Sequence, residues 1–284
     1  MNNFSINRFW KTLSWYTRVN MQRLLMWTIG TAVVVFFGEL LMIWMSNFLH
    51  SGEMVMVFSA MGRAAFTVVL LLMVASITSG INKKGKREAF LMLPANNLEK
   101  FMALVIYSSV ISIVCIFLAM VVGDTLRMGV MWLIGNWWES TLPDLIKSLT
   151  IDFNSDSTIT YTTSFVVMRG LSIITVIAWI HSLFLLGGTL LRKYAFVASG
   201  LAMLLSIRLY AWMYKTLDLN TNHVVEEFVE DGVLHAVLSA GQLYYITVLV
   251  TTLLAVFNYR AAFRIFKGYQ LITNKWTNYD ILKR

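Results

Sequence analysis

Apolar residues dominate six stretches of the chain, and polar connections separate them. The stretches cover residues 24–48, 55–81, 101–123, 171–191, 194–214 and 236–257. Each supplies the roughly 20 mainly apolar residues that a helix needs to cross the hydrocarbon of a bilayer. A chain in hydrocarbon must satisfy its backbone polar groups internally, so all six stretches are expected to be helices. The pattern predicts an all-α integral membrane protein with six transmembrane helices.

Positive charge gathers on alternate connections. With six crossings, the arm 1–23, the connections 82–100 and 192–193, and the tail 258–284 share one side. That side holds 17 of the 23 Lys and Arg and 3 of the 15 acids, which gives 17 minus 3, or +14. The rest of the chain carries 6 minus 12, or −6. Because cytoplasmic loops are enriched in Lys and Arg, both termini are expected to be cytoplasmic, and the loops 124–164 and 215–235 extracytoplasmic.

Composition narrows the functional classes. With 58% hydrophobic and 13% charged residues, the chain has no room for a soluble catalytic domain. Its basic balance indicates contact with anionic lipid head groups, and nucleic acid is not an expected partner. The single Cys115 excludes an intramolecular disulfide and a cysteine-based metal cluster. No catalytic or metal-binding residues are predicted; an unrecognised membrane enzyme stays an alternative, although its usual signatures are missing.

The arm 1–23 has the pattern of an amphipathic helix lying in the cytoplasmic interface. Phe9, Leu13, Tyr16 and Asn20 share one helical face. Aromatic residues in the arm suit head-group depth, and its basic first residues do not resemble a cleavable signal peptide. The arm either anchors the first helix or offers a docking surface to a cytoplasmic subunit, and these residues alone do not separate the two.

The connection 82–100 carries the most information. Gly85 is expected to end the second helix, and residues 86–93 can form two helical turns. Pro94 stops that short helix because the residue before a proline avoids the α region. The sequence therefore predicts a short amphipathic helix on the cytoplasmic side, held between two membrane helices.

The same connection contains a helix start and an apolar cluster. Asn96 is the expected N-cap of the third helix, and Glu99 is the reciprocal half of a capping box. Several apolar residues precede them on a loop that water would otherwise contact, so they are expected to pack against lipid, against this chain's own helices or against another protein. These residues are Phe90, Leu91 and Leu93.

The run from Arg87 to Phe101, placed after helix two of six, resembles the coupling-helix region of six-helix ABC exporter permeases of the type V class. The motif's order, Leu-Pro followed by a polar pair and then Glu-Lys-Phe, is similar to the order in small permease subunits of Bacteroidetes bacteria. The resemblance implies a non-enzymatic exporter permease in the bacterial inner membrane. A separate ABC ATP-binding subunit would hold ATP and Mg²⁺, and two permeases would form a homodimer or heterodimer. The docking residues that it implies are Glu88, Phe90, Leu91 and Leu93. The alternative is a non-transporting scaffold or immunity protein of the same fold.

Four charged residues lie within or at the outer ends of the predicted helices: Glu39, Arg63, Arg169 and Arg208. At about 1.5 Å per residue, Glu39 and Arg208 both lie roughly 21 to 23 Å from the cytoplasmic edge, where they could pair. The four residues could line a substrate path that favours an anionic head group. Alternatively, Arg63 and Arg169 reach the outer surface, and Glu39 and Arg208 form a structural ion pair.

Three smaller features complete the expectations. His181, near the middle of the fourth helix, is predicted to be a hydrogen-bonded structural residue. Residues 150–161 alternate in the manner of a small β-hairpin. The family resemblance implies a short extracellular helix at residues 224–229.

Overall fold

The computed structural model describes residues 4–45, 67–74, 84–135, 140–143, 159–191, 194–216, 223–230 and 233–268. The chain divides into two compact units, Met1–Thr150 and Ile151–Arg284. Within the described residues, five helices are long and apolar enough to cross a membrane. The chain therefore has the fold of a helical multi-pass membrane protein.

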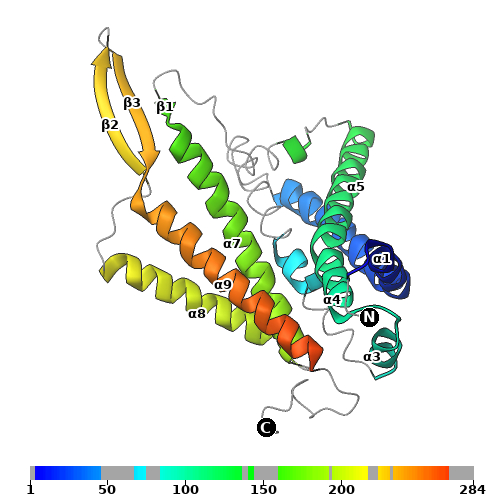
Figure 1. The fold of residues 1–284 in the computed structure, drawn as a ribbon. Helices are drawn as coiled ribbons and strands as arrows, with labels where there is room; N and C mark the ends of the chain where they lie inside the picture. Colours follow the sequence, from blue (N-terminus) through cyan, green and yellow to red (C-terminus); the bar gives the residue numbers. More distant parts are fainter. Residues whose placement is uncertain are drawn as a thin grey trace. The chain divides into compact units, whose positions relative to one another are not determined.

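Unit 1 is built on two long helices (Figure 1). The first is α1, Ile6–Met45. The second runs without interruption through α4 (Asn97–Ile106), the π-helical segment η2 (Tyr107–Ile111) and α5 (Ser112–Leu133). At about 1.5 Å per residue, the 40 and 37 residues of these helices span roughly 60 and 55 Å, well beyond the hydrocarbon core.

The two long helices of unit 1 run in the same direction. Arg8 pairs with Glu99 at the start, and the rings of Tyr16 and Tyr107 meet further along. Near the far end, Glu39 pairs with Arg127. The partners are 91, 91 and 88 residues apart, and an almost constant offset means parallel helices.

Both helices are longer than the apolar pattern predicted. The arm was expected to be separate from a first span that begins at residue 24, yet α1 continues through that point without a break. The third span was expected to end at Gly123, but the helix runs ten residues further, to Leu133. A Cβ atom added at Gly123 would lie only 2.9 Å from both the Ala32 carbonyl oxygen and the Cβ of Val35. This glycine therefore lets α1 and α5 approach closely.

The short helix predicted before Pro94 is present as α3, Lys84–Leu91. It begins one residue before Gly85 rather than after it, and residues 67–74, within the predicted second span, are also helical. The backbone N–H of Asn96 donates to Glu99 Oε2 at 2.9 Å, which is the Glu99 half of the predicted capping box. The short helix and the Glu99 half of the capping box are thus confirmed, whereas Gly85 lies within α3 and the expected end of the second span falls outside the described residues.

Unit 2 contains α7 (Thr163–Leu190), α8 (Ala195–Thr216) and α9 (Gln242–Lys267). Hydroxyl and amide side chains join α7 to α9: Thr251 donates to Thr175 at 2.9 Å, and Asn258 donates to Ser182 at 3.2 Å. Both pairs are 76 residues apart, so α7 and α9 also run parallel. The partners recur after seven residues, the repeat of a closely packed helix seam.

A small sheet stands at the N-terminal ends of α7 and α9 (Figure 1). Among the described residues it has the order β1-β3-β2, from β1 (Ile159–Tyr161), β3 (Val233–Ala240) and β2 (His223–Glu230). β3 pairs in parallel with β1 and antiparallel with β2. The strict all-α expectation is therefore wrong for this part of the chain.

The sheet corrects two details and bears on a third. Residues 224–229 form a strand, not the short helix that the resemblance implied. The sixth helix begins at Gln242 instead of residue 236, because β3 takes the apolar run before Gly241 and a short apolar run suits a strand as well as a helix. Of the hairpin expected at 150–161, residues 150–158 lie outside the described residues, and residues 159–161 form β1, which pairs with β3.

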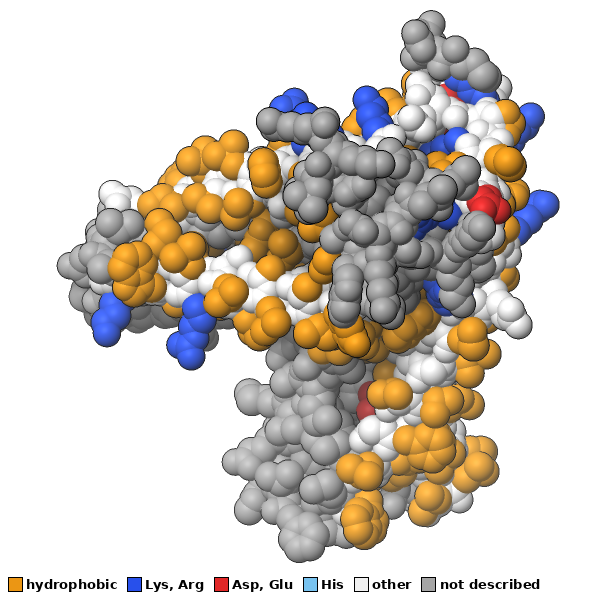
Figure 2. Space-filling view, turned by 90° about the horizontal axis from the view of Figure 1, so that it is seen from below, with side chains coloured by type: hydrophobic (Ala, Val, Ile, Leu, Met, Phe, Trp, Pro, Cys, Tyr) orange, Lys and Arg blue, Asp and Glu red, His pale blue; other side chains and the backbone are white. Residues whose placement is uncertain are grey.

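Apolar side chains cover long stretches of the visible helix surfaces, and lysine and arginine side chains stand in small groups between them (Figure 2). Exposed apolar residues are especially dense on α8, where Leu205 and Trp212 are examples. Contiguous exposed apolar surface of this extent suits lipid or a membrane partner.

Candidate functional site

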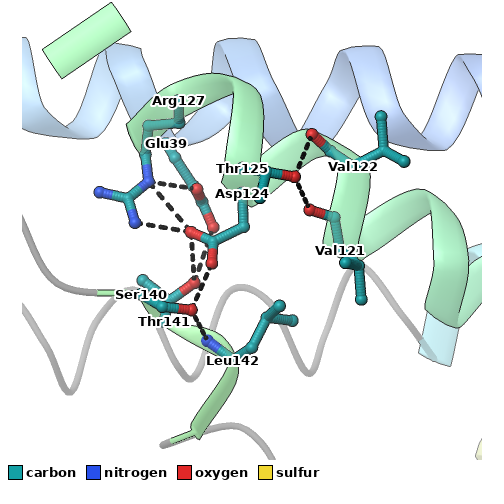
Figure 3. A network of polar contacts seen from close by, with 9 residues as sticks. All are labelled: Glu39, Val121, Val122, Asp124, Thr125, Arg127, Ser140, Thr141 and Leu142. Carbon is teal, nitrogen blue, oxygen red and sulfur yellow. Dashed lines mark hydrogen bonds and ion pairs between the residues drawn. The ribbon is translucent and has the colours of Figure 1, made fainter. Parts of the chain in front are cut away.

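The strongest polar cluster of unit 1 joins α1 to α5 (Figure 3). Arg127 Nε lies 2.8 Å from Glu39 Oε2, and Arg127 Nη2 lies 2.6 Å from Asp124 Oδ1. The Arg127 and Asp124 side chains are each 2% exposed. One guanidinium thus holds two carboxylates, one from its own helix and one from α1.

A short stretch of the connection after α5 completes this cluster. Ser140 Oγ donates to Asp124 Oδ2 at 2.5 Å, and Thr141 Oγ1 donates to Glu39 Oε1 at 3.0 Å. Leu142 packs against the apolar pair Val35 and Met120 beside it. Thr125 turns away and bonds carbonyls of its own helix (Figure 3). The network therefore fastens three pieces of chain: α1, α5 and residues 140–142.

Because the network is buried, breaking it costs more free energy than forming it contributes. A buried ion pair adds little over apolar packing, but removing one partner is costly because a charge is left without compensation. Here each carboxylate also accepts a hydrogen bond from a hydroxyl, Asp124 from Ser140 and Glu39 from Thr141, which offsets part of the cost of burying two acids beside one guanidinium. We therefore interpret the cluster as a latch that holds α1 and α5 together near their C-terminal ends.

The structure gives Glu39 a partner other than the expected Arg208. Glu39 binds Arg127 within unit 1, whereas Arg208 lies on α8 and is exposed. Equal depth in a bilayer says nothing about which helices are lateral neighbours. Arg169 is half-buried on α7, and Arg63 lies outside the described residues.

Sequence reasoning missed Asp124 and Arg127 because it ended the third span at Gly123. Their i, i+3 spacing is a helical signal, and the apolar run that follows them continues the helix to Leu133. Those two features together could have placed both residues inside the helix.

The α3 region is packed against the arm. Phe90 is only 1% exposed: its ring centroid lies 6.1 Å from that of Trp15 and 5.4 Å from that of Tyr16. The arm face predicted from helical periodicity is buried as a set, with Phe9 and Leu13 also inside. Phe90 is therefore internal packing of this chain, which corrects its expected role as a docking residue, and the arm's apolar face is covered by the same unit.

Glu99 ties the arm to the start of α4. Its carboxylate is fully buried and accepts bonds from the Ser5 backbone N–H at 2.7 Å and from Arg8 Nη2 at 2.9 Å, besides the capping bond from Asn96. Glu99 precedes the apolar stretch that begins at Phe101. The Arg8 hydrogen bond lowers the pKa of Glu99 from its ordinary value of 4.5 to about 2.

The remaining residues expected to dock a partner are only partly covered. Glu88, Leu91 and Leu93 are half-buried, and Lys100 Nζ donates to the Leu91 carbonyl at 2.8 Å. Between these two leucines, Met92 is 82% exposed. Met92 directly follows the last residue of α3, in the turn that leads to α4, and it is the most exposed large apolar side chain of this connection. The resemblance did not draw attention to it.

His181 behaves as predicted. It is buried on α7, and its Nδ1 lies 2.8 Å from the Tyr259 hydroxyl of α9. Together with the pairs from Thr175 and Ser182, this bond makes a continuous polar seam between α7 and α9. The histidine is a structural hydrogen-bonding residue.

No family model, no curated protein and no solved structure matches this chain. Over the described ranges, no group of three or more His, Cys, Asp or Glu side chains could hold a metal ion. Function must therefore be inferred from the fold, the charges and the contacts above.

Proposed function

We propose that this chain is the permease subunit of an ABC-type exporter of the bacterial inner membrane. The observation that carries the proposal is α3, a two-turn helix held rigidly between the arm and α4 with an exposed apolar tip. A separate ATP-binding subunit docks on this tip and holds ATP and Mg²⁺. The permease works as a dimer, and this chain itself catalyses no reaction.

Six spans, with both termini cytoplasmic, form part of the proposal. The support comes from helix direction: α1 and the α4 to α5 helix run parallel, so the chain must return across the membrane between them. The predicted span 55–81 lies in that interval. In unit 2 the parallel helices α7 and α9 are separated by α8, which gives the same alternation.

Charge supports the orientation. In unit 2, Arg264 and Lys267 lie in the last turn of α9, whereas the acidic strand β2 lies near the start of that helix. The basic end suits the cytoplasm and the acidic sheet the outer side. Arg169 and Arg208 remain our proposed contacts for an anionic head group along the substrate path, with Arg63 as the third.

The docking surface that we propose differs from the one implied by resemblance alone. Met92 lies at its centre and Glu88, Leu91 and Leu93 form its rim. The buried ring of Phe90 packs beneath this surface, against the arm. Apolar anchors at the centre of an interface carry most of the affinity, and truncating one costs on the order of 2 kcal/mol. Phe90→Ala is a poor test of docking, because it would loosen the arm as well.

The test is co-purification with ABC ATP-binding subunits encoded beside the chain. Met92→Ser should reduce recovery of the partner about 30-fold, from roughly 2 kcal/mol at about 1.4 kcal/mol per factor of ten. Met21→Ser, at an exposed methionine of the arm, is the matched control and should recover as much as wild type. Equal recovery with Met92→Ser would rule out docking at this tip. Failure of wild-type protein to recover any such subunit would refute the exporter assignment.

A further inference from the structure

Basic side chains line one face of α9 near its C-terminal end (orange to red in Figure 1). Arg260, Arg264 and Lys267 follow one another at spacings of four and three residues, so they lie on one side of the helix. All three are exposed. The residues that bond α9 to α7, Thr251 and Asn258, lie about half a turn away around the helix axis, at about 100° per residue. The basic face therefore points away from the packed side of α9.

The three cations of this face are not neutralised by acids. α9 contains no Asp or Glu, and no ion pair joins any of the three to an acid of the described residues. Lys267 Nζ lies 4.8 Å from the ring centroid of Phe263, one turn nearer the start of the helix. The Cα–Cβ bonds of Arg260 and Arg264 tilt in that direction too, as they do in any α-helix. The basic side chains thus lean toward the apolar part of α9.

That apolar part presents a strip on the same face. Leu249, Leu253 and Phe257 are 62, 62 and 66% exposed, and their spacing keeps them on the side of Arg260. From Leu249 to Arg260 the helix rises by about 16 Å, at about 1.5 Å per residue. One leaflet supplies about half of the roughly 30 Å hydrocarbon core. A phospholipid whose acyl chains cover the strip therefore has its phosphate at the level of Arg260.

The helix dipole accounts for only part of the basic face. Cations in the last turn of a helix interact favourably with its negative end, and Arg264 and Lys267 lie in that turn. The effect falls off within one turn, and Arg260 lies before it. The place of Arg260, directly after the exposed apolar strip, is explained by a negative group at the membrane surface.

The spacing of the arginines suits a phosphate. Side chains four residues apart on a helix have Cβ atoms about 6 Å apart, so the guanidinium groups of Arg260 and Arg264 can reach oxygens of the same phosphate. A guanidinium binds phosphate through two parallel hydrogen bonds. Zwitterionic head groups carry their own cation, which the three basic side chains would repel. An anionic head group such as that of phosphatidylglycerol carries none, so it fits this face better.

We propose that this face of α9 is a binding site for one anionic phospholipid. Its acyl chains lie along Leu249, Leu253 and Phe257, and its phosphate lies between Arg260 and Arg264, with Lys267 as the third cation. We call these six residues the α9 lipid site. The inference goes beyond the proposed exporter function, because it requires only that α9 crosses the membrane with its basic end at the surface.

Native mass spectrometry of the full chain in neutral detergent tests the site, with phosphatidylglycerol and phosphatidylcholine of identical acyl chains as probes. The wild type should bind one phosphatidylglycerol at least about 30-fold more tightly than phosphatidylcholine. Each basic side chain near an anionic membrane surface contributes about five-fold in affinity. Arg260→Gln with Arg264→Gln should therefore weaken phosphatidylglycerol binding about 30-fold and leave phosphatidylcholine binding unchanged.

Two double variants are the controls. Arg18→Gln with Lys215→Gln removes the same charge from two separate exposed positions on α1 and α8, and it should change the affinity by no more than about two-fold. Arg260→Lys with Arg264→Lys keeps the charge and should stay within about three-fold of wild type. Equal binding of both lipids by the wild type would overturn the proposal, and so would unchanged affinity in the double glutamine variant.

Two measurements on the wild type complete the test. Glycerol phosphate, which has the phosphate without acyl chains, should not displace the lipid at millimolar concentration; displacement would show a site for small phosphates and overturn the lipid assignment. Phosphatidylglycerol with a photoactivatable group in its acyl chain should label residues 249–257. Labelling confined to other parts of the chain would overturn the site even if the glutamine variants do not fold. No ATP-binding subunit is present, so the outcome is independent of the exporter assignment.

Discussion

Replacing Arg127 by methionine is the most informative single change in unit 1. Methionine keeps an apolar stem of similar length but removes the charge that Glu39 and Asp124 share. The two carboxylates would then face each other in a largely buried place, where the hydroxyls of Ser140 and Thr141 are their remaining side-chain partners among the described residues. The latch between α1 and α5 should open.

The magnitude follows from burial. Arg127 and Asp124 are each 2% exposed and Glu39 is 15% exposed, so water cannot restore much solvation. Breaking a buried pair by removing one partner typically costs about 3 to 5 kcal/mol. Removing the two acids as well, with Glu39→Gln and Asp124→Asn, eliminates the uncompensated charge. That triple variant should recover to within about 2 kcal/mol of wild type.

Reversible unfolding of the purified protein in mixed micelles gives these free energies. Arg208→Met is the matched control, because Arg208 is exposed, and it should change the free energy of unfolding by no more than about 0.5 kcal/mol. A loss below 1 kcal/mol for Arg127→Met would refute the latch. A triple variant as unstable as the single one would show that stranded charge is not the cause.

Two further predictions concern other contacts of unit 1. Gly123→Ala should lower the free energy of unfolding by about 1 to 3 kcal/mol in the same assay, because its Cβ would clash with Ala32. Gly129→Ala, in open space on the same helix, is the control and should leave the free energy of unfolding unchanged or raise it by up to about 1 kcal/mol. Equal effects of the two changes would contradict the close approach. Because the pKa of Glu99 is depressed, the arm junction should keep its full stability above about pH 4.5 and lose it as pH falls toward 2. The loss can be followed by the fluorescence of Trp15, obtained by subtracting the signal of a Trp15→Phe variant. In Arg8→Gln the midpoint of this loss should shift to higher pH, and an unchanged midpoint would contradict the pairing of Arg8 with Glu99.

Local patterns in the sequence predicted local structure well. The period of 3.6 residues identified the buried face of the arm, including Tyr16, and cap chemistry placed Asn96 and Glu99 correctly. These features depend on residues close together in the sequence, so no knowledge of the fold was needed. The structural role of His181 followed from the absence of a second titratable residue at relay spacing on its helix.

Contacts between distant parts of the chain were not predictable in the same way. Hydropathy ended the third span at Gly123, because two charges follow it, although burial and pairing let the helix continue past Asp124 and Arg127. The sequence also gave no sign that Glu39 pairs with Arg127, because nothing in it shows which helices are lateral neighbours. The sequence predicted that Phe90 packs against another surface, but not which one. That surface is the arm of the same chain, where Tyr16 lies 74 residues before Phe90.

The parallel direction of α1 and the α4 to α5 helix also constrains how the protein is assembled. The contacts described above join residues about 90 positions apart, so they cannot form until the intervening chain has been made. At roughly 5 to 20 residues per second, the ribosome needs about 5 to 20 s to supply that length. During this interval Glu39 is without Arg127 in a nascent helix. The first span must therefore hold a carboxyl group without its final partner until Arg127 has been synthesised.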